Sequence, residues 1–175
     1  MSAEIVFDAS DFERLAKDLA RVPYELKYHA VGRAMHRVAQ MGATQVIKRA
    51  AERVDIPQKF VRSRTSAFQS QGEATIRVRS DWISLYQLGA RQTKKGVTVR
   101  GRGSYRSAFI AGMASGHAGV FKRTGTARLP IRELFGPNPA NDISTSPDVY
   151  QDLINGVAER YVLPRLMHEL VRLLP

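Results

Sequence analysis

The chain has 175 residues, a formal net charge of +11 and no cysteine. Its length suits one domain that buries a sizeable core. Without cysteine it forms no disulfide and no thiolate metal site, which fits a reducing compartment. The first residues lack the basic flank and apolar run of a signal peptide, and no apolar run approaches the roughly 20 residues that cross a bilayer. We therefore expect a soluble protein, cytoplasmic at synthesis, with no membrane partner.

The positive charge is concentrated in the middle of the chain. Residues 1–55 are nearly balanced, residues 56–132 hold fifteen Lys and Arg against two acids, and residues 133–175 are net negative. No acid occurs between Trp82 and Arg132. Such a field favours a polyanion, most often nucleic acid. A basic protein interface and plain solubility are the alternatives that composition leaves open.

The predicted elements begin with a short strand over residues 4–7. Asp8 or Ser10 then caps a helix, because a side-chain oxygen accepts a hydrogen bond from a free first-turn amide. The longest helical pattern runs from Pro23 to Arg53. Its apolar residues recur at helical spacing and are expected to share one face. They are Leu26, Val31, Met35, Val38, Met41 and Val46.

A basic β region is predicted over residues 72–135, after a short helix that Pro57 opens over residues 59–62. Alternation of apolar and polar residues predicts a strand at residues 74–79. Residues 91–106, where glycines and cations cluster, are expected to form a mobile hairpin. The other β candidates are residues 82–86, 97–99, 108–111 and 119–122, together with an edge segment at residues 128–132 that contains a proline.

A C-terminal helix is predicted over residues 146–174. Pro147 and Asp148 suit its first turn, and Pro164 should kink it. The fold class is therefore α+β: a helical part over residues 1–55, an antiparallel β-sheet packed by the long helix, and a C-terminal helix kinked near Pro164. We expect residues 1–175 to form a single domain.

No catalytic, metal or cofactor site emerges from the sequence, and no small-molecule substrate is expected. The histidines lack the i, i+4 spacing with which two imidazoles bind one metal; they are His29, His36, His117 and His168. Glu133 is the lone acid near the basic zone and is expected to pair with Arg132 or Arg128. A hydrolase that uses His117 or His36 is the least favoured alternative, because carboxylates are scarce.

The basic segment over residues 91–106 is the better functional candidate. A glycine-jointed segment can project cations toward phosphates without reading bases. A solvated hairpin and an acidic protein partner are the alternatives. The residues expected to face DNA or a lumen are Arg91, Lys94, Lys95, Arg100, Arg102 and Arg106, and a possible secondary basic patch consists of Lys122, Arg123 and Arg128.

Residues 119–137, GVFKRTGTARLPIRELFGP, resemble the signature of the prophage minor tail protein Z family, a tail-completion family of long-tailed phages. YQLGARQTKKGVTVRG and SAFIAGM, upstream, are similar to the central segment of that family, and KRAAERVDIPQKFVRSR is similar to its N-terminal half. The resemblance covers residues 24–170 in the same order. Residues 138–146 have no counterpart, so nothing functional is carried over to them.

The resemblance implies a non-enzymatic virion protein that acts late in tail assembly. It implies a ring at the head-proximal end of the tail, hexameric to match the tail tube, with a lumen through which DNA passes. The implied partners are further copies of the chain, the tail tube, tail terminator or head–tail connector proteins, and phage DNA bound without sequence preference. The protein would move from the host cytoplasm into the tail or neck of the virion. A cytoplasmic nucleic-acid-binding protein without sequence specificity is the alternative function.

Overall fold

A computed structural model describes residues 20–21, 23–70 and 73–172. The strand predicted at residues 4–7, and most of the helix predicted after it, lie outside the described residues. The described residues form two compact units, and two long helices contribute to both. The first unit takes the described residues up to Thr44, Ala67–Ile76 and those from Asp152 onward, and the second takes Gln45–Ser66 and Arg77–Gln151. The expectation of a single domain stays a prediction.

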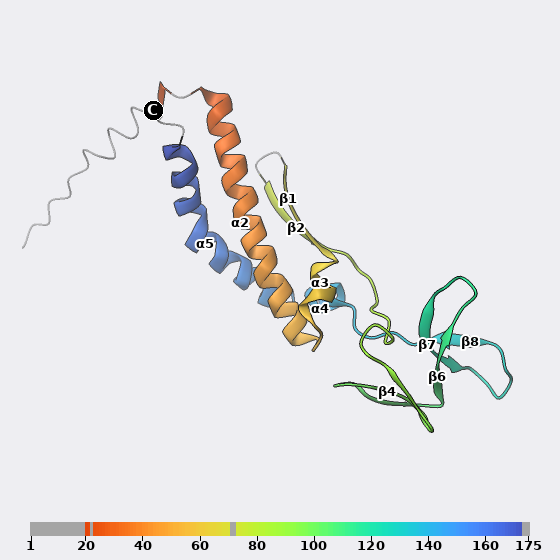
Figure 1. Cartoon of the computed structure of the whole chain (residues 1–175). Helices are drawn as coiled ribbons and strands as arrows, with labels where there is room; N and C mark the ends of the chain where they lie inside the picture. The colour runs from red at the N-terminus through yellow and green to blue at the C-terminus, as the bar shows by residue number, and fades with distance from the viewer. Residues whose placement is uncertain (1–19, 22, 71–72, 173–175) are drawn as a thin grey trace, which may run out of the picture. The chain divides into compact units, whose positions relative to one another are not determined.

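Helices and antiparallel strands confirm the predicted α+β class (Figure 1). The strands that the structure describes form three small sheets, whereas the sequence predicts one sheet. The elements in chain order are α2 (Tyr24–Arg53), α3 (Gln58–Arg62), β1 (Thr65–Ser70), β2 (Glu73–Val78), β3 (Arg91–Thr93), β4 (Gly96–Val99), β5 (Gly103–Arg106), β6 (Ala108–Gly112), β7 (Ala118–Arg123), β8 (Ile131–Glu133), α4 (Pro139–Thr145) and α5 (Pro147–Val171).

Helix α2 confirms the longest predicted helix, but its buried face differs from the predicted one. Leu26 and Val31 are exposed. The buried positions are mostly alanines, Ala30, Ala34, Ala39, Ala43, Ala50 and Ala51, together with Val38, Val46 and Ile47. Alanine favours a helix wherever it occurs, but here its small side chain also lets neighbouring elements approach the helix closely.

The close approach is clearest at Gly42 in the first unit. A Cβ atom at Gly42 would lie 3.0 Å from Cδ1 of Ile76 in β2 and 3.1 Å from Cδ1 of Ile154 in α5. One strand and one helix therefore pack against α2 at the same position. Nearer the start of the helix, Nε of Arg33 lies 2.8 Å from Oε2 of Glu169, which joins α2 to α5. Strands β1 and β2 pair with each other as a two-stranded sheet.

Helix α2 ends in a Schellman motif within the second unit. Asp55 has a φ of 50°, the left-handed conformation common after a helix end. The N–H of Ile56 donates to the carbonyl of Ala51 at 3.0 Å, and the N–H of Asp55 donates to that of Glu52 at 3.3 Å. The short helix α3 then follows Pro57, as predicted.

Helices α4 and α5 occupy the C-terminal part of the chain. The start of α5 at Pro147 confirms the prediction, and the helix continues through Pro164, where proline removes one backbone hydrogen bond. Helix α4 is an element that the sequence pattern does not predict. Its cap is Asn138, whose Oδ1 accepts the N–H of Ala140 at 3.1 Å, and Pro139 occupies its first turn. An Asn-Pro pair is a recognised start signal for a helix, so the sequence does contain this information.

Two three-stranded antiparallel sheets, β3-β4-β5 and β6-β7-β8, share one hydrophobic core in the second unit. Strands β2, β4, β6 and β7 confirm predicted strands. The buried core residues are Leu85, Val97, Val99, Ala108 and Val120.

The strand predicted at residues 82–86 is wrong. This segment makes an isolated bridge, between Ser84 and Phe135, and then turns. Ile83 and Leu85 are completely buried, so their apolar character reflects burial in the core and not membership of a sheet, whereas Trp82 and Tyr86 are exposed.

Candidate polyanion-binding surface

The basic segment forms a three-stranded sheet, whereas the sequence predicts a hairpin. Lys94 and Lys95 make the turn between β3 and β4, and Gly96 pairs with both Thr93 and Arg106. A Cβ atom at Gly96 would collide with the carbonyl oxygen of Tyr105, so only glycine allows this strand pairing. The expected mobility of the segment stays a prediction.

The two faces of this sheet have different characters, because side chains alternate along a strand. Val97 and Val99 point into the core and are buried. The pairing register places Arg91, Thr98 and Ser104 in one row of the opposite face, with Arg106 two residues further along β5. The hydroxyls of Thr98 and Ser104 are 3.1 Å apart and share a hydrogen bond. The outer face therefore carries cations and hydroxyls.

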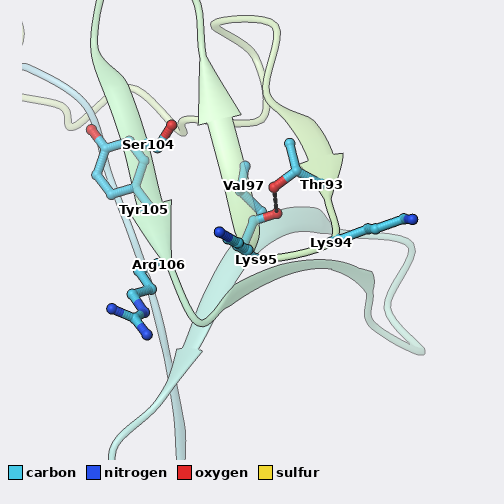
Figure 2. Close-up of a pocket in the computed structure, with 8 residues that line it drawn as sticks. Thr93, Lys94, Lys95, Val97, Ser104, Tyr105 and Arg106 are labelled. Atoms are coloured by element: carbon cyan, nitrogen blue, oxygen red, sulfur yellow. Dashed lines mark hydrogen bonds between the residues drawn. The ribbon is translucent and has the colours of Figure 1, made fainter.

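One end of the sheet has a hollow of about 670 Å³. Cationic and hydroxyl side chains line it, together with the backbone of the β3–β4 turn. Figure 2 shows Lys95 and Arg106 at the same end of the sheet as Tyr105, while Lys94 extends away from them. The polar lining residues are Thr93, Lys94, Lys95, Ser104, Tyr105 and Arg106.

Arg100 and Arg102 lie at the opposite end, in the turn between β4 and β5. The guanidinium of Arg102 donates to the carbonyls of Val54 and Asp55, the latter at 2.9 Å. These carbonyls follow the C-terminus of α2, where a cation is favourable. Arg102 thus stabilises the fold, and the six predicted cations do not gather at one place.

The cations around the hollow have no acidic partner among the residues that the structure describes. Within that part of the chain, no ion pair involves Lys94, Lys95 or Arg106. By contrast, Arg33 and Arg53 each bind a carboxylate. The charge around the hollow is therefore available to an anion from outside.

The secondary basic patch is not assembled as one surface. Lys122 pairs with Ala108 and Arg132 across the β6-β7-β8 sheet, whereas Arg123 pairs with Ile131. Adjacent residues of a strand point to opposite faces, so the side chains of Lys122 and Arg123 diverge. The Arg123 guanidinium lies 5.0 Å from the centre of the Phe109 ring, a cation–π distance. Arg128 is exposed in the loop before β8.

Glu133 binds His117 and Ser84, so the predicted pairing with Arg132 or Arg128 is wrong. Its Oε2 lies 2.8 Å from Nε2 of His117, and its Oε1 accepts the Ser84 hydroxyl at 3.1 Å. In a serine hydrolase the histidine lies between the hydroxyl and the carboxylate, where it accepts the proton. Here the carboxylate lies between the other two groups, which is not the order that activates a serine.

Sequence reasoning missed a second polar cluster, formed by Arg53, Asp142 and Tyr150. Burial, the largest influence, acts to raise the pKa of Asp142, but hydrogen bonds from Arg53 and Tyr150 outweigh it, and the pKa lies below its usual value. Burial and the hydrogen bond to Asp142 raise the pKa of Tyr150. No local motif signals this cluster, because its members come from three helices.

Among the described residues, no three histidine or carboxylate side chains are grouped to bind a metal. Within the same residues no helix is both long and apolar enough to cross a membrane.

A comparison with known families matched residues 13–169 to a family model described as prophage minor tail protein Z (GPZ). Comparison with curated proteins and with solved structures gave no match.

Proposed function

Because the chain belongs to the prophage minor tail protein Z family, and is thus a bacteriophage minor tail protein, we propose that it is a structural ring subunit. The ring lies at the head-proximal end of the tail and takes part in tail completion and head–tail joining. Its neighbours are the tail tube, the tail terminator or the head–tail connector, and its lumen carries the phage DNA. The protein has no catalytic role.

The observation that carries this proposal, beside the family, is the charge distribution. Fifteen Lys and Arg against two acids occupy residues 56–132, and the cations around the hollow have no acid partner within the described structure. Such a surface suits a lumen that contains DNA, because phosphates attract cations without regard to sequence.

Exposed apolar side chains on the first turns of α2 support assembly with further copies of the chain. Tyr24 is 79% exposed and Tyr28 is 46% exposed, and their rings stack with centroids 6.5 Å apart. Val31 continues the same side of the helix at a spacing of three residues and is also exposed. Contiguous exposed apolar surface is typical of interfaces between subunits.

A tail-joining experiment tests the proposal. Purified chain is added to tails that lack it, the particles are imaged by electron microscopy, and the mass of the free and assembled protein is measured. We expect a ring at the head-proximal end. A strictly monomeric chain that also fails to join tails contradicts the proposal. If that monomer binds DNA tightly with a steep salt dependence, the alternative of a free nucleic-acid-binding protein is favoured.

The apolar side chains of α2 provide a matched pair of variants for this experiment. Replacing Tyr24 and Tyr28 with Ser removes the exposed rings and is expected to weaken subunit association. Replacing Gln45, an exposed polar residue on the same helix, with Ser is expected to leave assembly unchanged. If both variants assemble equally well, the proposal that the start of α2 forms a subunit interface is contradicted.

A further inference from the structure

We propose that the hollow at the end of the β3-β4-β5 sheet binds phosphodiester groups of a polynucleotide through Lys95 and Arg106. The inference deepens the proposed function and rests on it for the identity of the polynucleotide as phage DNA. The proposed site does not include Arg100 and Arg102, which lie at the other end of the same sheet.

The backbone holds Lys95 and Arg106 close together at fixed positions. Arg106 pairs directly with Gly96, the residue after Lys95. The N–H of Ser107, the residue after Arg106, donates to the carbonyl of Lys95 at 3.0 Å. The two cations are therefore presented by adjoining backbone positions, whereas their long side chains extend into solvent. This arrangement suits two-point contact with one or two neighbouring phosphates.

Hydroxyl groups complete the lining of the hollow. Ser104 and Tyr105 contribute to its wall from β5, and Thr93 contributes from β3. The hydroxyl of Thr93 already donates to the carbonyl of Gly96 at 2.9 Å. The hydroxyl of Ser104 shares a hydrogen bond with Thr98, so it can donate outward when Thr98 is the donor between them, and Tyr105 is the other hydroxyl that lines the hollow. Serine and tyrosine hydroxyls are common partners of backbone phosphate oxygens in nucleic-acid complexes.

The character of the hollow favours a polynucleotide over an acidic protein. Protein interfaces draw most of their binding energy from large apolar or aromatic anchors that become buried. Within the described residues, none of the exposed large apolar side chains falls in residues 91–106. The lining also includes Val97, which is buried, and Tyr105, whose half-buried ring packs against the core, so neither projects outward as an apolar anchor. The exposed cations around them fit a contact that neutralises phosphate charge.

Fluorescence anisotropy with the full chain and a labelled DNA duplex, over a range of salt concentrations, tests the proposal. One variant replaces Lys95 and Arg106 with Gln. Its matched control replaces Lys48 and Arg62 with Gln, which removes the same charge from exposed helical positions. Thermal unfolding of both variants, expected to match that of the original chain, verifies folding.

The Lys95/Arg106 variant should bind DNA about tenfold more weakly at low salt, and its slope of log affinity against log salt should be shallower by about two. The control should lose less than about threefold. Equal losses in the two variants overturn the proposal, because they show that only net charge matters. An unchanged affinity in the Lys95/Arg106 variant overturns it as well.

Two competitors distinguish other anions from a polynucleotide. Inorganic phosphate should displace the duplex no better than sulfate at equal ionic strength, and polyglutamate should bind more weakly than DNA of similar charge. Specific displacement by phosphate, or equally tight binding of polyglutamate with the same loss in the variant, overturns the proposal. If the DNA-binding test fails but the chain still joins tails, the phosphate site in the hollow is contradicted and the proposed ring is not. If DNA binding depends on Lys95 and Arg106 but the chain does not join tails, only the proposed ring is contradicted.

Discussion

Arg53 and Asp142, which are 89 residues apart in the chain, form a two-point ion pair. Nε of Arg53 lies 2.9 Å from Oδ2 of Asp142, and Nη2 lies 3.1 Å from Oδ1. The hydroxyl of Tyr150 donates to the same carboxylate at 2.5 Å. Together these bonds connect the end of α2 to α4 and to the first turn of α5 within the second unit. Such two-point pairing is the strong form of arginine–carboxylate contact.

Replacing Asp142 with Asn should lower the free energy of unfolding at neutral pH by about 2 kcal/mol, since hydrogen bonds to charged groups contribute about 1.5–3 kcal/mol each. Chemical denaturation measures the loss. Replacing Asp152, an exposed acid in α5, with Asn is the control and should change stability by less than about 0.5 kcal/mol. Equal effects of the two substitutions would show that Asp142 contributes only net charge.

The same ion pair predicts a dependence of stability on pH. The pKa of Asp142 is lower in the folded chain than its unfolded value of about 3.9. Its contribution to stability is therefore fully present above about pH 5, about one pH unit above the unfolded value, and is lost as the pH falls through the folded pKa. The free energy of unfolding below about pH 5 should fall less steeply for Asp142→Asn than for the original chain. An unchanged acid slope would contradict the assignment.

We expect Arg102 to contribute to the free energy of unfolding and Arg100 not to, although both belong to the basic segment. Replacing Arg102 with Ala leaves the carbonyls of Val54 and Asp55 without their donor and should cost about 2 kcal/mol. Replacing exposed Arg100 with Ala should change stability by less than about 0.5 kcal/mol. Denaturant midpoints of the two variants check this, and similar midpoints would contradict the capping role of Arg102.

Gly96 is predicted to be irreplaceable in β4. An alanine there would place its Cβ against the carbonyl of Tyr105, so the β4–β5 pairing must shift, at a cost of about 3 kcal/mol. Gly112, at the end of β6, is the control, because no atom lies within 4 Å of the place that an added Cβ would take. Gly112→Ala should unfold at nearly the original temperature, whereas Gly96→Ala should unfold many degrees lower. Comparable melting temperatures would show that β4 and β5 pair less closely.

We expect Glu133 to stabilise the fold through its contacts with His117 and Ser84. Its removal in Glu133→Ala leaves the buried Ser84 hydroxyl without an acceptor and should cost about 1–3 kcal/mol. The neighbouring exposed Arg132, replaced with Ala, should have little effect. Thermal unfolding of the two variants checks this prediction. If Glu133 instead formed the ion pair with Arg132 that the sequence predicts, the two substitutions would lower the melting temperature equally.

Local signals in the sequence were sufficient for the elements that local chemistry controls. The periodicity from Pro23 to Arg53 predicts α2, because helical spacing and propensity act within a few residues. Pro147 predicts the start of α5 for the same reason. The family is also identified from the sequence, through the order of motifs such as residues 119–137.

Long-range packing determines which face of α2 is buried and whether an apolar segment is a strand, and hydrophobic periodicity does not. The buried face of α2 is its alanine face, because β2 and α5 approach it within contact distance of Gly42. Ile83 and Leu85 are buried in the core, whereas Trp82 and Tyr86 beside them are exposed, and a local pattern does not distinguish such a segment from a strand.

The sequence alone shows the charge of the basic segment, but it does not show which cations lie at which end of the β3-β4-β5 sheet. Six cations within residues 91–106 appear equivalent when only their order is known. The register of β3, β4 and β5 places Lys95 and Arg106 at one end, and the hydrogen bonds of Arg102 hold the other end at α2. Composition determined the sign and amount of charge, because these depend on residue type. Only the tertiary structure decided that Arg102 is bound by carbonyls far from it in the chain, whereas Lys95 and Arg106 lie at the other end of the sheet and remain available.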